Sequence, residues 1–169
     1  MDLQKVMNDY GEYCIRVAYL YVKDWAAAEE IVQDVFLAYY NNHSRFEGKS
    51  TLKTYLVKIT VHKSHDYLRS WRAKKRRLLQ PFQMTTTAPS IERQAVLAHE
   101  KSELIEALLE LAMHYREVLI LYYYEELKIR DIAALLECSE NTVKTRLKRG
   151  REQLKEKLET SEWEVLLHE

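Results

Sequence analysis

Polar and basic side chains recur on one face of a predicted helix near the end of the chain. Asn141, Lys144, Thr145, Lys148 and Arg149 follow one another at spacings that place side chains on one side of an α-helix. All of them can donate hydrogen bonds to base edges or to phosphate oxygens. Such a face at the beginning of a helix predicts binding in the major groove of DNA.

A helix-turn-helix is the arrangement that would present this face to DNA. We expect a first helix at 129–136, a turn at Glu137 and Cys138, and a second helix after Ser139, whose hydroxyl is placed to act as the N-cap. The predicted inner residues are Ile132, Ala133 and Leu136 in the first helix and Val143, Leu147, Gly150, Leu154 and Leu158 in the second. The alternative is a surface helical hairpin whose charged face is only solvated.

The composition favours an all-α chain. Apolar residues make up 47% of the 169 residues, which is enough for a core, whereas three Gly and two Pro leave little material for sheets and tight turns. Cys14 and Cys138 match no disulfide or zinc spacing, which is typical of a reducing compartment. The N-terminus lacks a signal-peptide pattern and no apolar run is long enough to span a membrane, so we expect a cytoplasmic protein.

Charge is segregated along the chain, although the net charge is zero. Residues 48–80 contain ten Lys and Arg and one acidic residue, and residues 140–157 contain seven Lys and Arg and three acidic residues. The segments 1–47 and 81–139 are acidic. Two basic blocks separated by acidic ones predict two contacts with a polyanion and a different role for the acidic surfaces.

Two helices are expected in the first acidic segment. One is predicted at 3–21, and another at 25–42 follows a potential N-cap at Asp24. The predicted inner residues are Leu3, Val6, Tyr10, Tyr13, Val17 and Leu20 in the first and Ile31, Val32, Val35, Phe36 and Tyr39 in the second. The outer face of the second helix is either an ordinary solvated face or a docking surface, and it carries Glu29, Glu30, Gln33, Asp34 and Leu37.

A loop at 41–50, where the periodicity breaks, precedes a third predicted helix at 51–79. The predicted core residues of this helix are Leu52, Tyr55, Leu56, Ile59, Tyr67 and Trp71. A basic stripe runs beside them through Lys58, His62, His65, Arg69, Arg72 and Arg76. Such a stripe predicts phosphate neutralisation and salt-sensitive binding. The neighbouring aromatic residues either belong to the core or stack on unpaired bases.

A linker is expected where the helical pattern stops, at 80–90 (QPFQMTTTAPS), which contains both prolines. We predict two small helical domains, at 1–79 and 99–169, joined by a flexible linker at 80–98. A helix at 91–111 leads into the second domain. Val118, Leu119, Leu121 and the tyrosines at 122–124 are expected to pack beneath the helix-turn-helix.

These segments together resemble a bacterial RNA polymerase sigma factor of the extracytoplasmic-function (ECF) type, in the sigma-70 superfamily. Residues 27–40 (AAEEIVQDVFLAYY) are similar to the helix that docks on the clamp helices of the largest polymerase subunit. Residues 45–69 (RFEGKSTLKTYLVKITVHKSHDYLR) are similar to the segment that opens and reads the −10 element. Residues 116–155 are similar to the region that reads the −35 element. The resemblance implies a sigma region 2-like bundle followed by a region 4-like helix-turn-helix domain.

The resemblance assigns roles to the residues at matching positions. Core polymerase would be bound by Glu29, Glu30, Gln33, Asp34 and Leu37. The −10 DNA would be bound by Phe46, Gly48, Lys49 and Ser50, which match a loop that captures a flipped base, and by Lys58, His62, His65, Arg69, Arg72 and Arg76. The −35 DNA would be bound by Asn141, Thr142, Lys144, Thr145, Arg146, Lys148, Arg149 and Arg151, with Arg146 and Arg151 on phosphates.

Three positions depart from the family's pattern. His62 stands where Asn is common and Tyr55 where Trp is usual, so the resemblance does not extend to a −10 base preference. Gly150 replaces a usual Ala in the recognition helix, which costs about 1 kcal/mol of helix stability. Alternatively, glycine at position 150 allows this helix to pack more closely against the first helix of the motif.

The predicted function is that of a sigma factor that places polymerase at a −35 element and melts the −10 region by trapping an unpaired base. It would need no catalytic residue, metal, cofactor or small-molecule substrate, and would not insert into a membrane. The resemblance implies an anti-sigma factor, often membrane-anchored, that holds the protein inactive until an envelope stress. The alternatives are a helix-turn-helix regulator that acts without polymerase, and an enzyme built on His62, His65 and Asp66 or on Glu103, Glu106 and Glu110.

Overall fold

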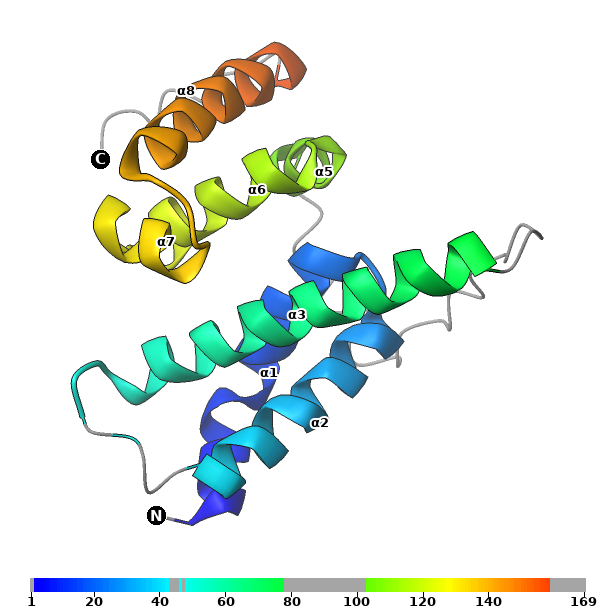
Figure 1. Cartoon of the computed structure of the whole chain (residues 1–169), viewed down its shortest axis with the longest axis vertical. Helices are drawn as coiled ribbons and strands as arrows, with labels where there is room; N and C mark the ends of the chain where they lie inside the picture. Colours follow the sequence, from blue (N-terminus) through cyan, green and yellow to red (C-terminus); the bar gives the residue numbers. More distant parts are fainter. Residues whose placement is uncertain (1, 43–45, 47, 78–102, 159–169) are drawn as a thin grey trace. The chain divides into compact units, whose positions relative to one another are not determined.

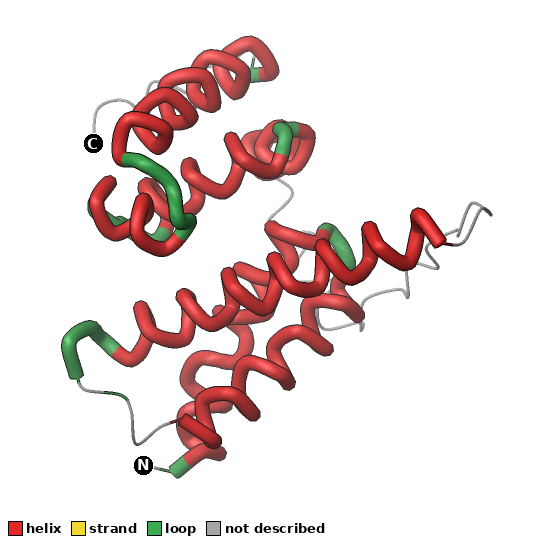
Figure 2. Tube along the Cα trace, in the orientation of Figure 1, coloured by secondary structure: helices red, strands yellow, loops and turns green. Residues whose placement is uncertain are grey.

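The computed structural model describes residues 2–42, 46, 48–77 and 103–158, with residues 73 and 75–77 described by their backbone alone. The elements in these ranges are helices, with no strand among them, so the prediction of an all-α chain is confirmed (Figure 2).

The chain divides into two compact units, Met1–Ser90 and Ile91–Glu169, and each is described by itself. The predicted linker at 80–98 and the first part of the helix predicted at 91–111 lie outside the described residues. The proposed domain boundaries therefore stay predictions.

Three helices form the bundle of unit 1, Met1–Ser90 (Figure 1). They are α1 (Leu3–Val22), α2 (Trp25–Asn42) and α3 (Leu52–Arg77), and each packs against the other two. The helix α2 includes Asn41 and Asn42, where the predicted helix at 25–42 and the predicted loop at 41–50 overlapped, and the Asn42 side-chain amide donates to the carbonyl of Ala38.

A tight corner connects α1 to α2. Lys23 ends α1 in the left-handed conformation (φ 58°), and its backbone N–H donates to the Tyr19 carbonyl. Asp24 then begins α2, because its buried carboxylate accepts the backbone N–H of Ala27 at 3.0 Å. This confirms the predicted N-cap, and the five predicted inner residues of α2 are all buried.

The inner face of α1 differs from the predicted stripe. Val6 and Val17 are buried as expected, but Leu3, Tyr10, Tyr13 and Leu20 are only half-buried. The other buried positions are Cys14, Ala18, Tyr21 and Val22. The small residues Cys14 and Ala18 allow neighbouring helices to approach closely. A tyrosine at the edge of the core can instead bury its ring and leave its hydroxyl in solvent.

The inner face of α3 is also rotated from the predicted one. Leu56 is buried as expected, and it is joined by Val57, Thr60, Val61 and Ser64. Leu52, Tyr55, Ile59, Tyr67 and Trp71 are half-buried instead. Thr60 is tolerated in the core because its hydroxyl donates to the Leu56 carbonyl at 2.8 Å, which satisfies the polar group within the helix.

Unit 2, Ile91–Glu169, contains a series of shorter helices before one long one (Figure 1). They are α5 (Glu103–Glu110), α6 (Met113–Leu119), the π-helical turn η2 (Ile120–Tyr124), α7 (Ile129–Leu135) and α8 (Glu140–Lys157). The helix α8 packs against α6 and α7. The fully buried side chains at this junction include Val118, Leu121, Ile132 and Val143.

The three tyrosines of η2 were expected beneath the helix-turn-helix, and this prediction is wrong. Val118, Leu119, Ile120 and Leu121 are all buried, whereas the residues at 122–124 are exposed. Four consecutive buried residues already fill the inner side of α6 and η2. The chain then turns the following tyrosines toward solvent.

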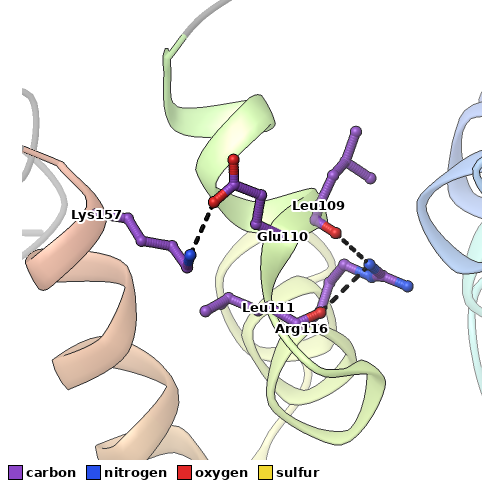
Figure 3. Close-up of polar contacts among 5 residues, drawn as sticks. All are labelled: Leu109, Glu110, Leu111, Arg116 and Lys157. Atoms are coloured by element: carbon purple, nitrogen blue, oxygen red, sulfur yellow. Dashed lines mark hydrogen bonds and ion pairs between the residues drawn. The ribbon is translucent and has the colours of Figure 1, made fainter.

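Arg116 stabilises the junction of α5 and α6 from a buried position (Figure 3). Its Nη1 donates to the carbonyl oxygens of Leu109 at 2.8 Å and Leu111 at 3.4 Å, which lie at the C-terminal end of α5. A cation at a helix C-terminus satisfies exposed carbonyls and opposes the negative end of the dipole. Figure 3 also shows Lys157 of α8 donating to the Glu110 carboxylate at 2.7 Å.

Candidate nucleic-acid interface

The helix-turn-helix predicted from the sequence is formed by α7 and α8. The first helix ends at Leu135, and Glu137 adopts the left-handed conformation (φ 52°) in the turn. The backbone N–H of Cys138 donates to the Ala133 carbonyl at 3.0 Å, which closes the helix end. Ile132 and Ala133 are buried as expected.

One inner residue of α7 was assigned wrongly. Leu135 is buried, whereas Leu136 is half-buried. The helix stops one residue earlier than predicted, and Leu136 has left the helical conformation (φ −92°, ψ 2°). The periodicity of the helix therefore no longer directs its side chain.

Ser139 is the N-cap of α8, as predicted. Its hydroxyl oxygen accepts the backbone N–H of Thr142 at 3.1 Å, and the hydroxyl groups of Ser139 and Thr142 lie 2.8 Å apart. The first backbone donors of α8 are partly satisfied by this cap, and the helix start is thereby fixed relative to the turn.

The predicted inner stripe of α8 is confirmed at every position, since Val143, Leu147, Gly150, Leu154 and Leu158 are all buried. Gly150 has a packing role, but its partner differs from the expected one. A Cβ at this position would lie 3.2 Å from Cδ1 of Leu119 and 3.4 Å from the Tyr115 carbonyl oxygen. The close approach is therefore to α6, and not to the first helix of the motif.

The opposite face of α8 carries the residues predicted to read DNA. Five of the eight side chains are exposed, namely Asn141, Lys144, Thr145, Lys148 and Arg149. Thr142, Arg146 and Arg151 are half-buried at the margins of this face. Arg151 Nη1 donates to the hydroxyl oxygen of Tyr123 at 3.2 Å, a contact between residues 28 apart that periodicity alone does not predict.

An aromatic cluster lies at the start of α3 in unit 1. The ring of Phe46 is 5.1 Å from that of Tyr55, and Tyr55 is 6.4 Å from Tyr39 of α2 in an edge-on arrangement. Gly48 has φ +67°, a conformation that disfavours other residues. Of the predicted −10 loop residues, Phe46 thus belongs to this cluster, while Lys49 is exposed and Ser50 is half-buried.

Thr51 caps the N-terminus of α3, and this cap was not predicted from the sequence. Thr51 Oγ1 accepts the backbone N–H of Thr54 at 3.2 Å, and the two hydroxyl oxygens lie 2.9 Å apart. The Thr51 carbonyl accepts the N–H of Tyr55 at 3.0 Å. A hydroxyl residue followed by Thr three positions later is the signal that would have found it.

The basic stripe of α3 is less uniform than predicted. His62 and Arg72 are exposed, whereas Lys58 and His65 are half-buried, and the side chain of Arg76 lies outside the described part of the chain. The His65 ring lies 5.7 Å from that of Tyr21. Arg69 is exposed and pairs with Asp66 at 2.6 Å.

The outer face of α2 is exposed at each of the predicted docking positions, Glu29, Glu30, Gln33, Asp34 and Leu37. Leu37 is 60% exposed, and Tyr40 beside it is 58% exposed, which leaves apolar area among the carboxylates. Partial burial raises the pKa of the Tyr67 phenol on α3, and the Asp24 and Glu30 carboxylates raise it further.

The side chains considered for metal binding are used differently or left apart. Asp66 pairs with Arg69, and Glu110 pairs with Lys157. Within the described ranges, no group of three His, Cys, Asp or Glu is arranged to hold a metal ion. In the same ranges, no helix is long and apolar enough to cross a membrane.

Family models match both units of the chain. A model described as "Sigma-70 region 2" matches residues 6–74, and one described as "Sigma-70, region 4" matches residues 101–154. The first match includes all of α2 and α3 as far as residue 74. The second includes the helix-turn-helix.

Several curated proteins and solved structures are similar over most of the chain. "RNA polymerase sigma factor SigV" of Bacillus subtilis is 31% identical over 85% of this chain and 83% of its own length. "ECF RNA polymerase sigma factor SigX" of the same organism is 28% identical over 96% and 87%. The fold is similar to that of the sigma factor RpoE solved with the anti-sigma factor NepR from Bartonella quintana (TM-score 0.70, 20% identity, 94% and 97% coverage). It is also similar to CnrH solved with the cytosolic domain of CnrY (TM-score 0.59, 20% identity, 90% and 84% coverage).

Proposed function

Because the chain belongs to the sigma-70 family of RNA polymerase sigma factors, and within it to the ECF type, we propose that it directs core polymerase to a −35 and a −10 promoter element. Family membership makes the protein a transcription initiation factor.

The observation that carries the proposal is the exposed polar face of α8, supported from behind by a buried stripe. Ser139 fixes the helix start and Gly150 allows close packing on α6, so the face is presented by a rigid element. Lys144, Thr145, Lys148 and Arg149 enter the major groove of the −35 element in this proposal. Each good pairing with a base is worth roughly 1–3 kcal/mol of discrimination.

The −10 element is bound by unit 1 in the same proposal. Phe46 and Tyr55 provide a stacking surface beside Gly48, Lys49 and Ser50, where one unpaired base is captured. Phosphates of the strand are held by the basic side chains of α3, namely Lys58, His62, His65, Arg69, Arg72 and Arg76. Binding energy melts the duplex, and no catalytic residue, metal or cofactor takes part.

Core polymerase docks on the outer face of α2 in this proposal. The exposed carboxylates Glu29, Glu30 and Asp34 share the outer face of α2 with the exposed Leu37, and this combination is suited to a partner with basic and apolar side chains. The partner assigned by the family resemblance is the pair of clamp helices in the largest polymerase subunit.

An anti-sigma factor is a further proposed partner. RpoE and CnrH, which share the fold, were each solved with another protein, and the partner of RpoE is an anti-sigma factor. We propose that this chain is cytoplasmic and that such a partner prevents it from binding polymerase until a stress releases it. A membrane-anchored partner would hold the chain at the inner membrane.

Reconstitution with bacterial core RNA polymerase tests the function. The expected result is a stable complex that starts transcription at discrete new sites on fragmented DNA of the source genome. Alignment of the start sites then yields both promoter elements. Sequence-specific duplex binding without a polymerase complex would instead establish the regulator that acts without polymerase.

A matched pair of charge reversals tests the docking face. Glu30→Lys with Asp34→Lys on α2 should abolish the polymerase complex, because the basic partner surface would then meet like charges. Asp9→Lys on the exposed side of α1 is the control for a change of charge in the same unit, and it should leave the complex intact. Equal losses in both variants would refute the assignment of the face to α2.

A further inference from the structure

The hydrogen bond between Tyr123 and Arg151 joins η2 to α8 beside the DNA-reading face. Arg151 Nη1 lies 3.2 Å from the Tyr123 hydroxyl oxygen and donates to it. Arg151 follows Lys148 by three residues, so the two side chains lie on neighbouring parts of the α8 surface. Tyr123 lies 28 residues from Arg151 in the sequence and is not among the residues predicted to bind DNA.

Both residues are positioned by features specific to this fold. In the π-helical turn, the N–H of Glu125 donates to the Ile120 carbonyl, which widens the helix over Ile120–Tyr124, a stretch that includes the buried Leu121. The Tyr123 ring then packs edge-on against Tyr122 with the ring centres 4.9 Å apart.

Close packing of the two helices brings Arg151 within reach of Tyr123. Gly150 immediately precedes Arg151 and lies against Leu119 of α6 with no room to spare for a larger side chain. The distance between α8 and the end of α6 is therefore short at this level. The guanidinium spans the remaining gap to the tyrosine hydroxyl.

The chemistry of the pair is suited to a phosphate group. A guanidinium has five N–H donors, and a tyrosine hydroxyl that accepts one of them keeps its own O–H free to donate. Within residues 103–158, the polar partner of Arg151 is this hydroxyl and not a carboxylate, so the positive charge is not neutralised locally. Tyr123 is 37% exposed and Arg151 is half-buried, so solvent reaches the pair.

We propose that Tyr123 and Arg151 together bind one phosphate of the DNA backbone at the edge of α8. Tyr123 donates its O–H to the phosphate and orients the guanidinium toward the same group. The inference rests on the proposed function of α8 as a duplex-binding helix, and it adds Tyr123 as a contacting and positioning residue. The competing explanation is that the hydrogen bond between Tyr123 and Arg151 is purely structural and only stabilises the packing of η2 on α8.

Duplex binding over a series of salt concentrations tests the proposal. The full chain, alone and in complex with core polymerase, is titrated with a fluorescent duplex of mixed sequence. Tyr123→Phe should weaken binding about three- to tenfold, since it removes one hydrogen-bond donor and the orienting contact. Its salt dependence should stay unchanged because no charge is lost. Arg151→Gln should weaken binding and lower the slope of log affinity against log salt by about 0.9.

Coupling between the two variants separates joint binding from independent effects. In the Arg151→Gln background, Tyr123→Phe should weaken binding less than it does in the wild-type chain, because only the hydrogen bond of the hydroxyl, and no longer the orientation of the guanidinium, is then lost. Full additivity of the two changes would overturn the proposal. Tyr122→Phe removes a neighbouring exposed hydroxyl in the same turn and serves as the matched control, with unchanged affinity expected.

Thermal unfolding of the same variants identifies a purely structural tie. If Tyr123→Phe lowers the unfolding temperature but leaves duplex affinity at the wild-type value, the pair binds no phosphate and the proposal fails. It fails also if the wild-type chain shows no salt-dependent duplex binding, either alone or with polymerase. Salt-dependent binding with the expected coupling, but without a polymerase complex, would support the phosphate pair and refute the sigma-factor docking.

Discussion

The two long basic helices, α3 and α8, begin in the same way and are packed differently. Each starts at a hydroxyl N-cap with a threonine three positions later, Thr51 with Thr54 in α3 and Ser139 with Thr142 in α8. In both pairs the cap oxygen accepts the backbone N–H of that threonine. The start of a helix is therefore set by the same local chemistry in both units.

The inner faces show what separates the two helices. In α8 the buried positions are aliphatic apart from Gly150, whereas the buried face of α3 includes Thr60 and Ser64. A stripe of aliphatic residues can be recognised from spacing alone. A face that buries small hydroxyl residues and leaves aromatic ones half-exposed cannot, because hydrophobicity points to the wrong side of the helix.

The outer faces of α8 and α3 differ in how many of their basic side chains already have partners. Among residues 103–158, no hydrogen bond or ion pair engages the side chains of Lys144, Lys148 and Arg149. On α3, by contrast, Arg69 is paired with Asp66 and His65 packs against Tyr21. In the proposed complex, DNA would therefore meet uncommitted side chains on α8, whereas on α3 it would have to replace contacts within the unit.

The largest effect is expected from removing the basic pair at the centre of the α8 face. Lys148→Ala with Arg149→Ala should reduce −35-dependent transcription about 30-fold or more, since the two base contacts proposed for these residues are worth roughly 1–3 kcal/mol each. Polymerase binding should remain, as α2 is untouched. Lys155→Ala, an exposed change nearer the end of α8, is the control. A double variant that also loses polymerase would contradict the separation of roles between the units.

Core truncations test the difference between the inner faces. Leu147→Ala in α8 should lower the free energy of unfolding of unit 2 by about 2–5 kcal/mol, and Val61→Ala in α3 should lower that of unit 1 by about 2 kcal/mol. Ile59→Ala should cost less than Val61→Ala despite its larger side chain, because Ile59 is only half-buried. Denaturant unfolding followed by circular dichroism measures these changes. A larger loss from Ile59→Ala than from Val61→Ala would mean that the face predicted from hydrophobicity is the buried one.

The shared helix start predicts similar losses in both units. Thr51→Ala and Ser139→Ala should each lower the free energy of unfolding by about 1 kcal/mol, since each leaves a backbone N–H without its cap. Glycine at either position is the control, as it costs only a few tenths of a kcal/mol. Thermal unfolding of the four variants is the measurement, and a loss confined to one unit would show that the caps are not equivalent.

The smallest effect is expected at Gly150. Alanine there gains about 1 kcal/mol of helix propensity, but its Cβ would press on Leu119 at 3.2 Å, so the net change should be below about 1 kcal/mol. In a Leu119→Ala background the same substitution should become more favourable, because the obstructing side chain is gone. Denaturant unfolding of both pairs measures this. An equal effect in the two backgrounds would mean that Leu119 does not limit the approach of α8 to α6.

From the amino-acid sequence alone we could predict the helical class, the helix at 25–42, the caps at Asp24 and Ser139, and the whole inner stripe of α8. These depend on interactions within a few residues, namely capping hydrogen bonds and helical spacing of aliphatic side chains. The exposed set on α8 followed from the same spacing, since a correct inner stripe also defines the outer face.

The packing of the helices against one another sets which faces of α1 and α3 are buried, whether the tyrosines of η2 are exposed, and what lies against Gly150. Each of these depends on how closely a neighbouring helix approaches, which selects small residues such as Cys14 and Thr60 over larger apolar ones. The contact of Tyr123 with Arg151 belongs to the same class. It joins residues 28 apart through the packing of α8 on α6, and no local pattern in the sequence encodes that distance.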